Sequence, residues 1–352
     1  GDEFAVLLPG DADAADALVR QLESALAPPF AIADIALGVQ VKIGVVLFPA
    51  HGLTPHDLFR HMDMAMRQAK KCGQGHAVFD PLQNPNPSQR LTFAGELRRA
   101  IEGGDLELHL QPKVDMATGR ICGAEGLVRW PHATRGLILP GEFIDLAEHT
   151  GLIRPLTEWV METAFRLNHA WTRQGCALPI AVNLSARNLR EDQLLERIRQ
   201  LQATWPLDPG LIEIEITEST VMEDAEFALR VLHGLRGQGI PLYIDDFGTG
   251  YSSLSYLQKL PVDCIKIDKS FVHDMTVSKD SLLIVRSTID LAHDIGRKVV
   301  AEGVETRQHW EQLAALGCDM AQGYFIAHPM PAEAFPAWVR DYQAPAPVTR
   351  RS

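Results

Sequence analysis

Eight short apolar segments separated by helical patterns are the feature that most constrains the fold of this chain. Strands are expected at residues 106–110, 121–128, 180–184, 211–217, 240–244, 264–267, 298–301 and 320–325. Helical spacing fills most of the intervals, at 153–173, 189–201, 224–238, 281–295 and 307–316. Strands alternating with helices over this length predict an α/β fold, a (β/α)₈ TIM-like barrel. An open doubly wound sheet is the alternative, but no G-x-G-x-x-G follows an expected strand.

The first 80 residues predict a small α/β segment of their own. Strands are expected at 3–8, 39–48 and 76–79, and helices at 12–26 and 58–71. Residues 81–90 are rich in Pro, Asn, Gln and Ser, which predicts a linker. Helical spacing resumes at 91–102. The expected organisation is a segment at 1–80, a linker at 81–90, a barrel at 91–340 and a disordered tail at 341–352.

Composition excludes several classes of partner. The formal net charge of -12 argues against binding a nucleic-acid polymer or an anionic membrane. No apolar run is long enough to span a bilayer, and no signal-like start is present. Five widely spaced cysteines without a C-x-x-C pair predict reduced thiols and a cytoplasmic location. The chain begins at Gly1 rather than Met, so we expect it to be a fragment, such as the cytoplasmic part of a longer sensor protein.

Two adjacent carboxylates, Asp245 and Asp246, follow the expected strand at 240–244. Phe247 and a Gly248-Thr249-Gly250 turn come after them. Neighbouring carboxylates repel each other unless a positive charge lies between them, and a divalent metal is the simplest partner. The plain alternative is a pair of ordinary surface acids.

Polar residues recur in or after the other expected strands, whose carboxyl ends converge on one face of a barrel. A single such acid is more often a cap or an ion-pair partner, but capping does not explain a polar group on seven successive strands. Carboxylate and amide oxygens without a His or Cys cluster favour Mg²⁺ or Mn²⁺. The residues are Glu125, Asn183, Glu213, Glu215, Glu218, Asp245, Asp246, Lys266, Asp268, Glu302, Glu305 and Gln322.

The barrel region resembles the EAL-domain family of cyclic di-GMP phosphodiesterases. The family's Glu-Ala-Leu stands here as Glu125-Gly126-Leu127. The other matching motifs are Gln111-Pro112-Lys113-Val114, Asn183-Leu184-Ser185-Ala186-Arg187, Glu215-Ile216-Thr217-Glu218-Ser219, Asp245-Asp246-Phe247-Gly248-Thr249-Gly250, Lys266-Ile267-Asp268, Ala301-Glu302-Gly303-Val304-Glu305-Thr306 and Gln322-Gly323-Tyr324. The first segment resembles the C-terminal half of a GGDEF (diguanylate cyclase) domain, with Gly1-Asp2-Glu3-Phe4 as the shortened motif. We expect no cyclase activity, because the first half of that domain is absent.

The resemblance implies hydrolysis of cyclic di-GMP to linear pGpG by a phosphodiesterase with two Mg²⁺ or Mn²⁺ ions, in bacterial second-messenger signalling. Glu125, Asn183, Glu215 and Asp245 would hold the first ion, and Asp245 would bridge to a second ion held by Asp246. Lys266 and Glu302 would position and deprotonate the attacking water, and Glu218 would brace the loop at 246–253. The remaining substrate-binding residues would be Gln111, Arg129, Asp268, Glu305 and Gln322, with Arg129 as a phosphate partner.

The resemblance also implies a homodimer through the barrel, and two other functions stay open. The same barrel could be a cyclic di-GMP receptor without turnover, although such members usually lack metal ligands and none is missing here. A barrel lysine such as Lys266 could instead form a Schiff base. That chemistry needs a lowered lysine pKa, whereas nearby carboxylates would raise it.

Overall fold

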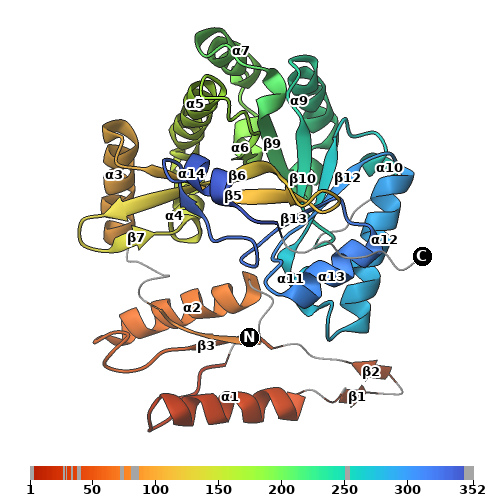
Figure 1. Ribbon diagram of the computed structural model, residues 1–352. Coiled ribbons are helices and arrows are strands. Elements are labelled where there is room, and N and C mark those ends of the chain that lie inside the picture. Colours follow the sequence, from red (N-terminus) through yellow and green to blue (C-terminus); the bar gives the residue numbers. More distant parts are fainter. Residues whose placement is uncertain are drawn as a thin grey trace. The chain divides into compact units, whose positions relative to one another are not determined.

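The chain divides into two compact units, Gly1–Phe93 and Ala94–Ser352. The computed structural model describes residues 4–26, 28, 30–32, 35–37, 41–71, 75–80, 87–249 and 254–344 (Figure 1). Gly1, Asp2 and Glu3 lie outside these residues, as do most of the expected tail and the loop residues 250–253.

The first unit is a small α/β arrangement, as expected. Its elements are α1 (Ala12–Leu26), β1 (Phe30–Ile32), β2 (Ile35–Leu37), β3 (Ile43–Val45), α2 (Pro55–Lys71) and β4 (His76–Val78). β1 and β2 pair antiparallel, and β3 and β4 pair parallel. Ala65 and Ala69, on one face of α2, are fully buried.

Two of the strand predictions in this unit need correction. Residues 4–8 form no strand, because no strand in the described part of the chain pairs with them and Phe4 and Leu7 are 91% and 97% exposed. The strand expected at 39–48 is limited among the described residues to β3, with Val39 and Gln40 outside them.

A helix begins inside the expected linker. α3 runs from Pro87 to Gly103, so residues 87–90 are helical. Proline is tolerated in the first turn of a helix, where its missing N–H would have no partner, and here it starts the helix. At the other end, α14 (Phe335–Asp341) extends to the first residue of the expected tail.

The second unit is a closed barrel of eight strands, which confirms the predicted fold. The barrel strands are β5 (Glu107–Asp115), β6 (Ile121–His132), β8 (Ile180–Leu184), β9 (Ile212–Thr217), β10 (Leu242–Phe247), β11 (Cys264–Ile267), β12 (Lys298–Ala301) and β13 (Met320–Gln322). Their order is β5-β13-β12-β11-β10-β9-β8-β6, and pairing of β5 with β6 closes the ring.

One strand departs from the parallel pattern of a (β/α)₈ barrel. β5 runs antiparallel to both of its neighbours, β6 and β13. A short turn joins β5 to β6, where the Asp115 N–H donates to the Arg120 carbonyl oxygen over 2.9 Å. A parallel pair would need a long crossover at this point, so the short turn dictates the reversed strand.

Helices surround the barrel strands (Figure 1). They are α4 (Pro140–Thr150), α5 (Ile153–Thr172), α6 (Ala186–Leu189), α7 (Leu194–Thr204), α8 (Glu218–Glu223), α9 (Ala225–Gly237), α10 (Leu254–Leu257), α11 (Lys269–Asp274), α12 (Lys279–Asp294) and α13 (Arg307–Leu316). Two short strands, β7 (Gly136–Ile138) and β14 (Met330–Pro331), extend the sheet beside β6 and β5. Of the described helices, none is both long and apolar enough to cross a bilayer.

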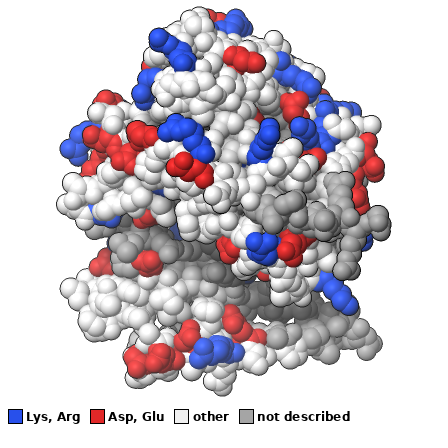
Figure 2. Space-filling view, viewed as in Figure 1, with Lys and Arg blue, Asp and Glu red and all other residues white. Residues whose placement is uncertain are grey.

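Alternation along the strands places apolar and polar side chains on opposite faces. In β9, Ile212, Ile214 and Ile216 alternate with Glu213 and Glu215, and all five are buried. The two glutamates contact lysines from β5 and β11, which are not neighbours of β9, so this polar face points into the barrel. On the outer surface, the described acidic and basic side chains are interspersed in the view of Figure 2.

Candidate metal and catalytic site

The end of β10 brings two successive carboxylates into one site. Neighbouring side chains of a regular strand point to opposite faces. Asp246, however, has a φ of 54°, in the left-handed region, and the pairing of β10 with β11 is irregular between Ile244 and Phe247. The Asp246 N–H donates to Asp245 Oδ1 over 2.9 Å. The irregular backbone allows both side chains to approach the same cluster.

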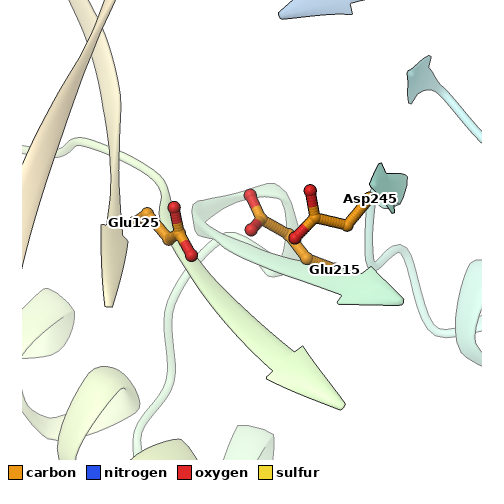
Figure 3. Close-up of side chains that lie close together, drawn as sticks. All are labelled: Glu125, Glu215 and Asp245. Carbon is orange, nitrogen blue, oxygen red and sulfur yellow. The ribbon is translucent and has the colours of Figure 1, made fainter. Parts of the chain in front are cut away.

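Two groups of carboxylates share Asp245. Oxygen atoms of Glu125, Glu215 and Asp245 lie within 4.8 Å of one another, as do those of Asp245, Asp246 and Glu302. Figure 3 shows the first group, with side chains from β6, β9 and β10 close together. The shared Asp245 makes the two groups adjoining candidate cation sites.

Lys266 lies among these carboxylates and is fully buried. Its Nζ is 2.6 Å from Glu215 Oε2, 2.6 Å from Glu302 Oε1, 3.2 Å from Asp245 Oδ2 and 3.6 Å from Glu125 Oε2. Burial alone would lower the pKa of Lys266, but these four carboxylates raise it well above its usual value. The amine therefore stays protonated, which argues against Schiff-base chemistry.

One ammonium group does not balance this density of negative charge. Burial, opposed in part by Lys266, raises the pKa of Glu302 to about 8 and that of Glu215 to about 7. Burial, together with the charges of Asp245 and Asp268, raises the pKa of Asp246 to about 6. Fully ionised, the five carboxylates of the two groups and Lys266 leave four negative charges, which two divalent cations would neutralise.

Amide side chains complete the site around Glu125. Asn183 Nδ2 donates to Glu125 Oε1 over 2.8 Å, and Gln322 Nε2 donates to Glu125 Oε2 over 2.7 Å. Gln322 Nε2 also donates to Gln111 Oε1 over 3.1 Å, and Gln111 Nε2 donates to the Ala327 carbonyl oxygen over 3.2 Å. Gln322 Oε1 is buried without a hydrogen-bond partner, so an acceptor oxygen stands unused beside the carboxylates. An oxygen-rich set of this kind fits a hard divalent cation.

Glu218 contacts the start of the loop that follows β10. It is the first residue of α8 and is buried. Its Oε2 accepts a hydrogen bond from the Gly248 N–H over 3.1 Å. Thr249 Oγ1 donates to the Asp246 carbonyl oxygen over 2.8 Å. These two hydrogen bonds fix the described part of the loop.

The other predicted site residues differ in whether they lie near the carboxylate cluster. Asp268 lies close enough to Asp246 for a side-chain hydrogen bond and also caps α11 by accepting from the Ser270 N–H over 3.0 Å. Arg129 is buried near Glu125 and Tyr324 and donates to the Val128 carbonyl oxygen over 2.9 Å. Within the described part of the chain, the exposed Glu305 carboxylate faces His273 at 3.8 Å rather than the carboxylate cluster.

Sequence reasoning gave no role to two buried residues beside the site, Lys113 and Tyr243. Lys113 Nζ contacts Glu213 Oε2 and lies 3.5 Å from Glu215 Oε1. The Tyr243 hydroxyl donates to Glu213 Oε1 over 2.8 Å. Their spacing in the sequence could have indicated this position. Lys113 lies two residues after Gln111, and Tyr243 lies two residues before Asp245, so each is on the same face of its strand as a predicted site residue.

Curated relatives match most of the chain. It is 41% identical over 337 residues to the bifunctional diguanylate cyclase/cyclic di-GMP phosphodiesterase MucR of Pseudomonas aeruginosa, covering 95% of this chain and 49% of that protein. It is 38% identical over 344 residues to the cyclic di-GMP phosphodiesterase PdeR of Escherichia coli, covering 97% and 52%. The chain thus spans about half the length of these curated relatives.

Solved structures and family profiles agree with these relatives. The PaMucR phosphodiesterase in complex with c-di-GMP is 42% identical, with a TM-score of 0.68, covering 69% of this chain and 99% of that chain. An EAL domain protein of Listeria monocytogenes is 33% identical, with a TM-score of 0.62, covering 69% and 96%. Residues 1–76 match the diguanylate cyclase GGDEF domain profile, and residues 94–329 match the EAL domain profile. The chain therefore belongs to the EAL domain family.

Proposed function

We propose that this chain hydrolyses cyclic di-GMP to linear pGpG with two divalent cations, Mg²⁺ or Mn²⁺. The observation that carries the proposal is Asp245, which is common to two adjoining groups of carboxylates inside the barrel. The relatives MucR and PdeR are named as cyclic di-GMP phosphodiesterases, and the PaMucR structure is a complex with c-di-GMP. Both facts support this substrate.

The side chains present fit two such cations. Glu125, Asn183, Glu215 and Asp245 would hold one, and Asp245 and Asp246 would hold the other, beside Glu302. When bound, two cations stabilise the charge that develops at the phosphate and lower the pKa of the attacking water. The acidic pocket thereby becomes a site for an anionic substrate, despite the net charge of -12.

The chain's own residues orient the reaction and move the proton. Lys266 Nζ, 2.6 Å from both Glu215 and Glu302, fixes these carboxylates and would position the attacking water together with Glu302. Glu302, whose Oε1 lies 2.6 Å from Lys266 Nζ, would accept the proton of the attacking water in its ionised form, which that ammonium group and bound cations would favour. Gln111 and the Arg129 guanidinium would bind the dinucleotide, with Arg129 paired to a phosphate.

Removal of divalent cations should abolish hydrolysis. In EDTA we expect no formation of pGpG above background, and excess Mg²⁺ or Mn²⁺ should restore it, because the carboxylate cluster lacks the compensating charge without them. Chromatographic quantification of pGpG is the measurement. Zn²⁺ and Ca²⁺ added at the same concentration serve as controls. Full turnover in EDTA would contradict cation-dependent catalysis.

We further propose that the barrels pair as a homodimer. Exposed apolar side chains on α12 and just before it support this, since Val277 is 86% exposed and Leu283 is 62% exposed. Light scattering on the chain should give a dimer mass, and Leu283→Asp should shift it toward the monomer mass. An unchanged monomer mass for the wild type at all concentrations would contradict the dimer.

A further inference from the structure

Lys113 spans the inside of the barrel. It lies on β5, and its Nζ contacts Glu213 and Glu215 on β9. On the shorter way around the ring, β6 and β8 separate these two strands. A lysine in an ordinary ion pair of a sheet would contact a carboxylate on an adjacent strand. Here the ammonium group reaches across the interior, and only 1% of the residue is exposed.

Glu213 and Tyr243 fix the position of that ammonium group. Glu213 accepts from Lys113 through Oε2 and from the Tyr243 hydroxyl through Oε1, the latter over 2.8 Å. Lys113 Nζ also lies 4.6 Å from the centre of the Tyr243 ring, a cation–π geometry. Glu213 precedes Glu215 by two residues and Tyr243 precedes Asp245 by two, so these side chains form a layer directly beneath the carboxylate cluster.

The two oxygens of Glu215 are held by different lysines. Lys266 Nζ is 2.6 Å from Oε2, and Lys113 Nζ is 3.5 Å from Oε1. Glu215 itself is fully buried, and both of its carboxylate oxygens contact a lysine. A carboxylate fixed from two sides presents its oxygens in one orientation, which is what a ligand of a metal ion requires.

We propose that Lys113 is a positioning residue for Glu215 and that Glu213 and Tyr243 hold it in place, so this layer sets the affinity of the metal site. The inference rests on the proposed function, because it assigns Glu215 as a metal ligand. Lys113 and Glu213 carry opposite charges and contribute no net charge to the site. The layer therefore acts through orientation rather than through the overall potential. A simple structural ion pair would stabilise the barrel without affecting metal affinity.

The test compares Mn²⁺ binding without substrate, measured from the electron paramagnetic resonance signal of free Mn²⁺. The double variant Lys113→Met/Glu213→Gln keeps the net charge and leaves an acceptor for the Tyr243 hydroxyl. Because no buried charge is left alone, we expect this variant to fold. It frees Glu215 Oε1, so the dissociation constant for Mn²⁺ should rise about tenfold or more. In Glu213→Gln alone, Glu215 is the remaining carboxylate beside Lys113. Mn²⁺ binding should also be weaker, because the Lys113 charge then competes with the metal ion for Glu215.

Two further variants separate positioning from stability. Thr157→Val, on α5, removes a buried hydrogen bond of 3.0 Å to Asn188 Oδ1 on α6 and should lower the melting temperature without changing Mn²⁺ binding. Tyr243→Phe removes one hydrogen bond to Glu213 and should weaken Mn²⁺ binding less than the double variant does. Kinetically, the double variant should need a higher Mn²⁺ concentration for half-maximal turnover, with little change in KM for cyclic di-GMP, since Lys113 faces Glu215 and not the substrate.

Each outcome decides the inference. Wild-type Mn²⁺ affinity in the charge-conserving double variant would overturn it and leave a structural ion pair, whatever the result for Glu213→Gln. Absence of Mn²⁺ binding by the wild type would overturn both the metal site and this inference. Mn²⁺ binding without hydrolysis by the wild type would overturn the proposed function alone, and the comparison of dissociation constants would still decide the role of Lys113.

Discussion

Asp245→Asn should lower the rate of cyclic di-GMP hydrolysis by about 10³-fold or more. Asp245 is the one carboxylate common to both groups, so its charge would serve two cations, and several kcal/mol of stabilisation depend on such ligands. The variant should fold normally, since asparagine has the same shape. In EDTA its melting temperature should equal or exceed that of the wild type, because the Asp245 charge repels Glu215, Asp246 and Glu302. Steady-state kinetics and thermal unfolding are the measurements.

Asp263→Asn is the matched control for this variant. Asp263 lies at the opposite end of the neighbouring strand, where its Oδ2 accepts from the Leu242 N–H over 3.0 Å. The substitution removes the same charge at the other end of the same sheet and should leave hydrolysis unchanged. Retention of full turnover by Asp245→Asn would show that the shared carboxylate is not part of a two-cation site.

Lys266→Met should abolish hydrolysis and destabilise the barrel. The substitution removes the ammonium group shared by four carboxylates, those of Glu125, Glu215, Asp245 and Glu302. Removal of one member of a buried ion pair costs about 3 kcal/mol or more, which corresponds to a fall in melting temperature of about 6–12 °C for a domain of this size. Thermal unfolding in EDTA measures the loss. Mn²⁺ should raise the melting temperature of this variant more than that of the wild type, because added cations replace part of the missing charge.

Lys298→Met provides the comparison for this second prediction. Lys298 is the exposed first residue of β12, and its substitution should change neither the melting temperature in EDTA nor the rate of hydrolysis. If Lys266→Met kept the wild-type melting temperature in EDTA, the four surrounding carboxylates would not depend on its charge. The description of the site as a crowded anionic cluster would then be wrong.

Local sequence pattern was enough to predict the barrel and most of the cluster. Alternation of isoleucine with glutamate in β9, and an acid or amide near the end of successive strands, follow directly from the two faces of a strand. The parallel part of the barrel then brings these ends together without further information. Glu125, Asn183, Glu215, Asp245, Asp246, Lys266, Glu302 and Gln322 are accordingly gathered by the structure.

What the sequence did not predict depends on contacts between distant segments. The strand expected at 106–110 continues to Asp115, through Pro112, which has no N–H to donate, and Lys113, a residue rarely buried alone. The carboxylates of β9, about 100 residues away in sequence, make a buried Lys113 favourable. The left-handed backbone of Asp246 is likewise invisible in the sequence, since non-glycine residues rarely adopt it.

The most direct test of this account is incubation of the chain with cyclic di-GMP and Mn²⁺, with separation of the products by chromatography and mass spectrometry. The account predicts conversion to linear pGpG that is lost in EDTA and in Asp245→Asn. Binding of cyclic di-GMP without conversion, in the presence of saturating Mn²⁺, would contradict it and identify the barrel as a receptor instead.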